Sequence, residues 1–257
     1  MPVINHYYLK DITSEFEAAG PDVSFNWSTV SNTDKGRVRT VNEDAYFYSE
    51  AQSLWIVADG MGGHSRGDRA SREVVDGIRG FVRSDDLIES IKEIETRLLL
   101  ANNTCRTMYR HKVVGSTVAA LLAFGPLSIF LWAGDSRIYR WRNGSLKQMT
   151  EDHSVVQEKL VRGEIAQEDI QDHPSANLLT RAVGVHQNLR IEMHHANIQV
   201  GDRYLLCSDG LYGELQKTEI EALLGLENLE YALSGLIQLA LDRGGRDNIT
   251  GIITQVE

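Results

Sequence analysis

The chain is poor in cysteine and proline and has no long apolar run. Its 257 residues include two cysteines, Cys105 and Cys207, which lie far apart and outside any CxxC spacing. A disulfide framework is therefore not expected, and a cytoplasmic location is predicted because that compartment is reducing. No run of eighteen apolar residues occurs, and the first residues lack the basic and then apolar layout of a signal peptide. Membrane insertion and export are therefore not expected.

An excess of positive charge is also missing. The chain has 26 Lys and Arg against 36 Asp and Glu, which gives a net charge of −10 and a pI near 5.3. Binding to nucleic acid is not expected, because phosphate backbones are bound by basic surfaces. Bound cations would offset part of this negative charge.

What the chain does contain is a series of strand-like and helix-like stretches. Apolar side chains at helical spacing predict helices over residues 65–82 and 87–108. Two more helical runs, at about 216–224 and 228–242, precede a last strand-like run at 249–256. Because the strand-like runs are grouped, two antiparallel sheets with helices outside them are favoured over alternating βαβ units. The predicted fold class is α+β, a sandwich of two sheets.

The same pattern predicts the domain organisation. Residues 1–23 are polar and contain the Gly20-Pro21 breaker, so we expect an irregular N-terminal extension outside the core. Residues 24–257 are expected to form one domain. Within it, Asn143-Gly144 joins two strand-like runs, which is a strong hairpin signal.

Four aspartates stand at the ends of four separate apolar runs. They occur in VADG at Asp59, WAGDS at Asp135, LCSDG at Asp209 and RDNIT at Asp247. Each motif alone is a common strand end or turn, but together with Asp44 they indicate a rim lined by carboxylates. Neighbouring carboxylates repel one another unless a cation lies among them, and oxygen ligands alone select hard ions such as Mg²⁺ or Mn²⁺. A metal centre is therefore predicted.

Two other features lie beside these acids. Arg39 comes five residues before Asp44, and a guanidinium can grip two oxygens of a phosphate at once. The glycine-rich turn after Asp59 has no G-K-[ST] ending and fails GxGxxG, so it is not a nucleotide-binding loop. Its glycines fit a turn that needs small residues, or one that leaves the Gly60 carbonyl and the Asp59 carboxylate facing a cation.

Eight motifs in order resemble those of the metal-dependent protein phosphatases (PPM, or type 2C, family) in their bacterial form. They are RTVNEDA, VADGMGGH, GSTVAALL, AGDSRIYRWRNG, MTEDHS, LTRAVG, LLCSDGL and RDNIT, and they extend from about residue 24 to 257. The resemblance implies a four-layer α-β-β-α sandwich, two antiparallel sheets flanked by helices. It also implies that residues 24–257 are the catalytic domain.

The resemblance implies a centre of two Mn²⁺ or Mg²⁺ ions. Asp59 would bridge the ions, and Asp44, helped through water by Glu43, would belong to the second. The first ion would be held by the Gly60 carbonyl, Asp209 and Asp247.

Three further roles are implied in the same way. Arg39 would clamp the substrate phosphate. Asp135, with Asp209, matches the acids of a third, weaker metal site, although a position behind the ligands is equally natural for it. Eukaryotic relatives have a histidine where this chain has Met61, which leaves two roles open for His64. It could protonate the leaving group through water, or it could orient the start of a helix.

The implied activity is hydrolysis of phosphoserine and phosphothreonine in proteins by a metal-activated water, without a covalent phosphoenzyme. The implied substrates are phosphorylated proteins, including a cognate bacterial Ser/Thr kinase that the enzyme opposes, and a monomer is expected. The alternative is a non-catalytic phosphopeptide-binding scaffold on the same fold. It is disfavoured because a degenerate member should have lost some of these acids. A small phosphoester substrate is a third hypothesis, and no nucleotide loop supports it.

Overall fold

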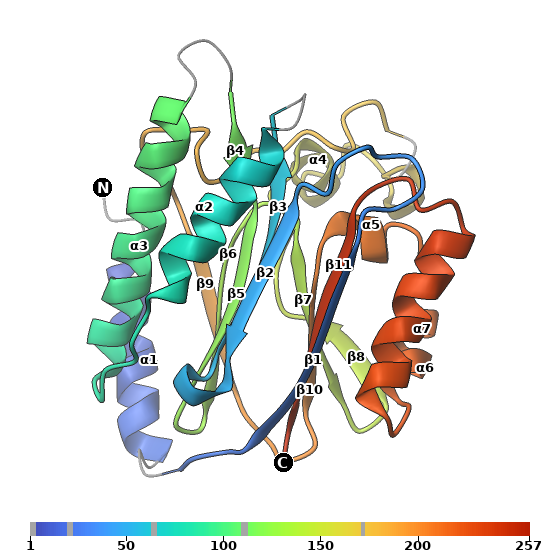
Figure 1. The fold of residues 1–257 in the computed structure, drawn as a ribbon. Helices are drawn as coiled ribbons and strands as arrows, with labels where there is room; N and C mark the ends of the chain where they lie inside the picture. The colour runs from blue at the N-terminus through green and yellow to red at the C-terminus, as the bar shows by residue number, and fades with distance from the viewer. Residues whose placement is uncertain (1–3, 20–22, 63–65, 109–112, 171–172) are drawn as a thin grey trace.

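Two antiparallel sheets pack face to face, with helices on both outer faces (Figure 1). This computed structural model describes residues 4–19, 23–62, 66–108, 113–170 and 173–257. The predicted α+β sandwich is confirmed. No helix in the described ranges is long and apolar enough to cross a membrane.

The five-stranded sheet joins the beginning and the end of the chain. Strand β1 pairs along its whole length with β11, and β10 pairs with β11 on the other side. In spatial order, the strands are β1 (Trp27–Asp34), β11 (Ile249–Val256), β10 (Arg203–Cys207), β7 (Arg137–Arg142) and β8 (Ser145–Gln148).

The hairpin between β7 and β8 turns at Asn143 and Gly144, as predicted. Both residues have positive φ, 51° and 80°. This conformation is typical of a two-residue hairpin turn and explains the Asn-Gly pair.

The middle strands of the second sheet are deeply buried. Strands β5 and β6 are buried at every residue, because helices cover one face and the other sheet covers the opposite face. This explains their unbroken apolar sequences. In spatial order, the strands are β2 (Asp44–Ser49), β3 (Leu54–Met61), β5 (Val118–Phe124), β6 (Leu127–Ala133) and β9 (Glu192–Asn197), with the short β4 (Gly115–Ser116) paired to β3.

Each outer face has its own helices. The second sheet is covered by α1 (His6–Ala19), α2 (Gly67–Arg79) and α3 (Leu87–Met108), and the five-stranded sheet by α5 (Asp209–Tyr212), α6 (Lys217–Leu224) and α7 (Leu229–Asp242) (Figure 1). Three short helices lie in connections: η1 (Glu50–Gln52), α4 (Val155–Val161) and η2 (Gln167–Asp169).

The hydrophobic core is layered in the same way. One cluster lies between the two sheets and contains Trp55, Phe130 and Tyr204, each fully buried. The other large clusters lie between each sheet and its helices. Burial on both faces fixes the sheets against each other, so their ends form a rigid frame.

The expectation that residues 1–23 are irregular and lie outside the core is wrong for the described part. Helix α1 packs on the second sheet beside α3, and Ile4, Leu9 and Ile12 belong to the core under these helices. The Ile4 N–H donates to Glu95 Oε1 of α3 at 3.1 Å. The apolar residues of α1 that pack on the sheet are separated by polar residues, so the sequence analysis did not predict this helix. The start of the catalytic domain at residue 24 stays a prediction.

Candidate metal centre

The antiparallel topology collects the five aspartates at one end of the sandwich. Asp44 begins β2 and lies directly opposite Asp59, near the end of β3. Asp135 follows β6, Asp209 follows β10 as the first residue of α5, and Asp247 comes just before β11. These strand ends lie at the upper end of the view in Figure 1, where α5 begins.

These carboxylates lie close enough for their charges to act on one another. Burial raises the pKa of Asp59 well above its ordinary value, and the charges of the other four aspartates raise it further. Burial is also the largest cause that raises the pKa of Asp44 to about 7 and of Asp209 to about 6. Without a cation, several of these groups therefore hold protons near neutral pH.

Two carboxylate oxygens of this pocket are buried without a hydrogen bond from any described residue. They are Asp44 Oδ1 and Asp209 Oδ1. Asp44 Oδ2, by contrast, accepts from the Ser208 hydroxyl at 2.7 Å and from the Thr250 hydroxyl at 2.6 Å. Buried acceptors without donors are costly unless a cation binds them, and oxygen donors of this kind suit Mg²⁺ or Mn²⁺. The donor set therefore fits a hard divalent ion.

The carboxylates as placed do not form a complete set of metal ligands. Within the described ranges, no three His, Cys, Asp or Glu side chains are placed to hold an ion as they stand. Asp247 Oδ2 instead accepts from the Arg39 guanidinium at 2.5 Å. The arginine is thus an internal counter-ion, and its side chain is 48% exposed beside the acids. Ion binding would require these carboxylates to turn.

Glu43 and Gly60 connect the acids to helix α2. Glu43 Oε1 accepts from the backbone N–H of Gly67, the first residue of α2, at 2.9 Å. The Gly60 N–H donates to the Glu43 carbonyl at 3.0 Å. A Cβ at Gly60 would lie 2.0 Å from the Gly67 carbonyl oxygen, so only glycine fits this close approach. His64, the predicted acid or helix-orienting residue, lies outside the described residues.

Asn248 ties the arginine-bearing loop to β11. Its side-chain amide donates to the carbonyls of Lys35 and Val41 at 2.9 and 3.0 Å. Its Oδ1 accepts from the Glu43 N–H at 2.8 Å. One buried side chain therefore sets where residues 35–43, including Arg39, lie relative to Asp247. The sequence analysis did not single it out, although it stands in the RDNIT motif.

Asp135 is held by a network that sequence analysis also missed. The Tyr212 hydroxyl donates to the Asp135 carbonyl at 2.9 Å. The Arg137 guanidinium lies over the Tyr212 ring, 3.6 Å from its centroid, and pairs with Asp152 at 2.7 Å. The only sequence signal was that these residues lie in or near the AGDSR, MTEDHS and SDGL motifs, because their pairing spans distant segments.

A buried histidine fixes the same turn from the other side. The His153 N–H donates to the Gly134 carbonyl at 2.9 Å, and His153 Nδ1 accepts from the Gly134 N–H at 3.2 Å. Burial, together with nearby Arg181, lowers the pKa of His153 to about 4. The imidazole is therefore neutral and can act as an acceptor at neutral pH.

The cysteines and the paired histidines take no part in this pocket. Cys105 and Cys207 are free and buried, and burial raises the pKa of both thiols, which makes them poor nucleophiles. The Tyr8 hydroxyl of α1 hydrogen-bonds to the Nδ1 atoms of His194 and His195, at 3.2 and 2.8 Å. These residues therefore have packing roles.

Comparison with known proteins decides the family. Residues 33–234 match the family model described as protein phosphatase 2C. The chain belongs to the protein phosphatase 2C family. The predictions of this family and of a protein phosphatase enzyme are confirmed.

Individual relatives in this family match over most of the chain. The serine/threonine phosphatase Stp of Listeria welshimeri is 36% identical, over 87% of this chain and 93% of the relative. Serine/threonine protein phosphatase PstP of Mycobacterium tuberculosis is 32% identical, over 88% of this chain and 44% of the relative. These relatives are bacterial, as the motif forms suggested.

Solved structures of relatives agree with the fold. PppA, a regulatory component of type VI secretion in Pseudomonas aeruginosa, has a TM-score of 0.82 at 37% identity, covering 91% of this chain and 99% of PppA. The catalytic domain of PstP in complex with two manganese ions has a TM-score of 0.81 at 30% identity, covering 91% of this chain and 99% of that domain. Together with the family match, this supports a metal-dependent enzyme.

Proposed function

We propose that this phosphatase hydrolyses phosphoserine and phosphothreonine in proteins at a centre of two Mn²⁺ or Mg²⁺ ions. The observation that carries the proposal is the set of buried, mutually coupled aspartates with two unpartnered oxygens, next to a half-exposed arginine. The names of the relatives, which are serine/threonine phosphatases, support the choice of substrate.

The residues divide into two sets of ligands. Asp59 would serve both ions and Asp44 the second ion, with Glu43 behind it. Bound divalent cations would lower the pKa of water and offset the charge of the phosphate. The first ion would be held by Asp59, the Gly60 carbonyl, Asp209 and Asp247.

Arg39 would change partners when ions bind. Its guanidinium donates to Asp247 Oδ2 at 2.5 Å. With Asp247 serving as a ligand of the first ion, the planar guanidinium of Arg39 could hold two phosphate oxygens. Arg39 would thereby orient the phosphate against the acids. His64 would either protonate the leaving seryl or threonyl oxygen through water or orient the start of a helix.

We also propose a protein partner and a cellular location. The enzyme would oppose a cognate Ser/Thr kinase in the cytoplasm and act as a monomer. Asp135 and Asp209 would offer a third, weaker ion site. If the Asp135→Ala variant keeps an unchanged Mn²⁺ dependence of activity, the third site is wrong.

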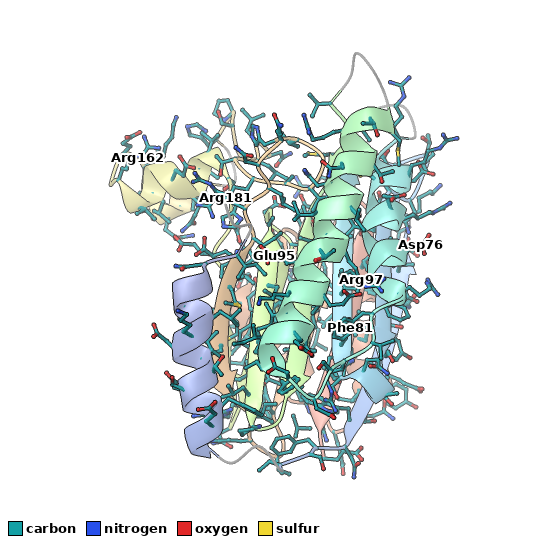
Figure 2. The ribbon with its side chains drawn as sticks, turned by 90° about the vertical axis from the view of Figure 1, so that its left-hand side faces the viewer. Asp76, Phe81, Glu95, Arg97, Arg162 and Arg181 are labelled. Atoms are coloured by element: carbon teal, nitrogen blue, oxygen red, sulfur yellow. The ribbon has the colours of Figure 1, made fainter. Side chains whose placement is uncertain are left out.

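The test is Mn²⁺-dependent phosphate release from a phosphothreonine peptide. The wild type should turn over, EDTA should abolish turnover, and Asp59→Asn should lower it by several orders of magnitude. Asp76→Asn is the matched control, because Asp76 lies on the outer side of α2 with a 67% exposed side chain (Figure 2). If the protein binds Mn²⁺ but releases no phosphate from any peptide or aryl phosphate, the scaffold alternative is favoured.

A further inference from the structure

Thr117 stands between the two strands that pair with the end of β3. Strand β4 ends at Ser116 and strand β5 begins at Val118, although both keep the same register with β3. The Thr117 N–H donates to the Asp59 carbonyl at 2.8 Å, as expected of an antiparallel pair. The Asp59 N–H, however, donates to the Thr117 hydroxyl oxygen, at 2.9 Å. The Thr117 side chain therefore holds the backbone of Asp59.

The same side chain contacts the turn that carries Asp135. Thr117 Oγ1 lies 2.6 Å from Ser136 Oγ, and both residues are buried, with 2% and 1% of their surface exposed. The Thr117 methyl group lies against Gly134, where an added Cβ would be 2.6 Å from Thr117 Cγ2. Threonine alone has both a hydroxyl and a methyl group on Cβ. One residue can therefore fix the backbone of Asp59 and contact the turn at Asp135.

We propose that Thr117 and Ser136 are a positioning pair that holds Asp59 and Asp135 in a fixed relation to each other. The proposal rests on the metal centre proposed above, in which Asp59 would serve both ions. Each hydroxyl acts through another residue. Thr117 acts through the Asp59 backbone, and Ser136 acts through Thr117.

The hydrogen bonds show why the two hydroxyls would act together. Thr117 Oγ1 accepts from the Asp59 N–H, and each hydroxyl has one hydrogen to donate. Across 2.6 Å, one hydroxyl donates to the other. Loss of the Thr117 hydroxyl removes the acceptor of the Asp59 N–H, and loss of the Ser136 hydroxyl removes the partner that orients Thr117. Because an unpaired buried polar group is costly, a change at Ser136 should also reach Asp59.

The first test removes the Thr117 hydroxyl and keeps the shape of the side chain. In Thr117→Val, Mn²⁺ affinity measured by calorimetry should fall roughly 10–100-fold for at least one ion. Thr117→Ser keeps the hydroxyl and should bind Mn²⁺ like the wild type, which a loss of packing alone would not explain. An unchanged Mn²⁺ affinity in Thr117→Val would overturn the proposal.

A second hydroxyl pair of the same kind provides the matched control. Thr254 Oγ1 lies 3.0 Å from Thr29 Oγ1, and Thr254 stands near the end of β11 that is remote from Asp247. Thr254→Val therefore removes a buried hydroxyl from a strand without touching the aspartates. Its Mn²⁺ affinity should equal that of the wild type. An equal loss of affinity in Thr254→Val and Thr117→Val would contradict a specific role for Thr117.

A double-mutant cycle tests whether the two hydroxyls act together. Ser136→Ala should weaken Mn²⁺ binding, but less than Thr117→Val does. The variant with both changes should bind Mn²⁺ like Thr117→Val alone, because Ser136 acts through Thr117. Two losses that simply add would show that the residues act independently, and the pair would be overturned.

Hydrogen exchange in the metal-free protein separates this proposal from the proposed function. If the wild type binds no Mn²⁺, the metal centre fails, and the exchange rate of the Asp59 amide decides the pair alone. That rate should rise roughly tenfold in Thr117→Val and also rise in Ser136→Ala, because the amide loses its acceptor or a well-oriented one. Thr117→Ser and Thr254→Val should keep the wild-type rate. A wild-type rate in Thr117→Val would overturn the proposal.

Discussion

The Asp44 carboxylate is fixed at one oxygen and free at the other. Its Oδ2 accepts from Ser208 and Thr250, while Oδ1 has no partner among the described residues. Behind Thr250, the Thr33 hydroxyl is 2.7 Å away and itself accepts from the Asn42 amide. This chain of hydroxyls orients Asp44, as groups behind metal ligands commonly do.

Thr250→Val keeps the shape of the side chain but removes a donor to Asp44. We expect Mn²⁺ affinity, measured by calorimetry, to fall roughly 10–100-fold for one of the two ions. Thr250→Ser keeps the hydroxyl and should bind Mn²⁺ like the wild type. If the valine variant also binds like the wild type, Thr250 does not position Asp44.

Arg39→Ala should raise KM for phosphorylated peptides, because the contact to phosphate is lost. Metal binding should persist, since the arginine is an alternative partner of Asp247 rather than a ligand. Arg37→Ala is a suitable control, because Arg37 is exposed and pairs with Asp242. Steady-state kinetics and Mn²⁺ calorimetry check both variants. A variant that no longer binds metal would show that the arginine has a structural role.

At this scale the sequence predicted the acids but not their partners. Asp59 and Asp209 were found because each ends an apolar run. Ser208, Thr250 and His153 were not, because their partners are 19 to 206 residues away in the chain. A hydroxyl in a motif has no recognisable role until its acceptor is known.

At the scale of elements, strand β3 and helix α2 contact each other through the backbone atoms of Gly60 and Gly67. Gly60→Ala would place a Cβ 2.0 Å from the Gly67 carbonyl oxygen. We therefore expect a lower melting temperature and weaker Mn²⁺ binding, because β3 carries Asp59. Gly77→Ala, within α2, meets nothing closer than 3.8 Å and should be neutral or stabilising, by about 0.5–1 kcal/mol. Equal melting temperatures for the two variants would contradict the close approach.

Helix α1 shows where element prediction fails. Leu9, Ile12 and Phe16 stand three and four residues apart, which is helical spacing, but they are embedded in polar sequence. Their burial depends on an outer sheet surface built by residues far along the chain. Helices α2, α3, α6 and α7 were predicted from apolar side chains at helical spacing, whereas the short helices α4 and α5 were not.

At the scale of the whole molecule, the five aspartates gathered at one end make the stability of the fold depend on pH. The pKa of Asp44 is raised from 3.8 to about 7, and that of Asp209 from 3.8 to about 6. A carboxyl group whose pKa is raised by folding stabilises the fold at pH values below its unfolded-state pKa. This contribution is lost as the pH rises through its folded-state pKa. The melting temperature of the metal-free protein should therefore fall between about pH 4 and pH 7.

Calorimetry in EDTA checks this prediction. Asp44→Asn should show a smaller fall, because the amide does not titrate. Added Mn²⁺ should raise the melting temperature most at the higher pH, where protons no longer compete for the carboxylates. A metal-free protein whose stability is flat or rises over this range would contradict the coupling of the acids.

The fold of the whole molecule followed from grouped strands, whereas the arrangement of its charges did not. Antiparallel pairing explains why all five aspartates reach the same end, but the Arg39–Asp247 pair that occupies part of that end required the structure. The most direct measurement is anomalous diffraction at the manganese edge from crystals grown with Mn²⁺. Two peaks next to Asp59, with Asp44 on one and Asp209 and Asp247 on the other, are expected. No peak at this end of the sandwich, with Asp247 still paired to Arg39, would contradict a metal centre built from these residues.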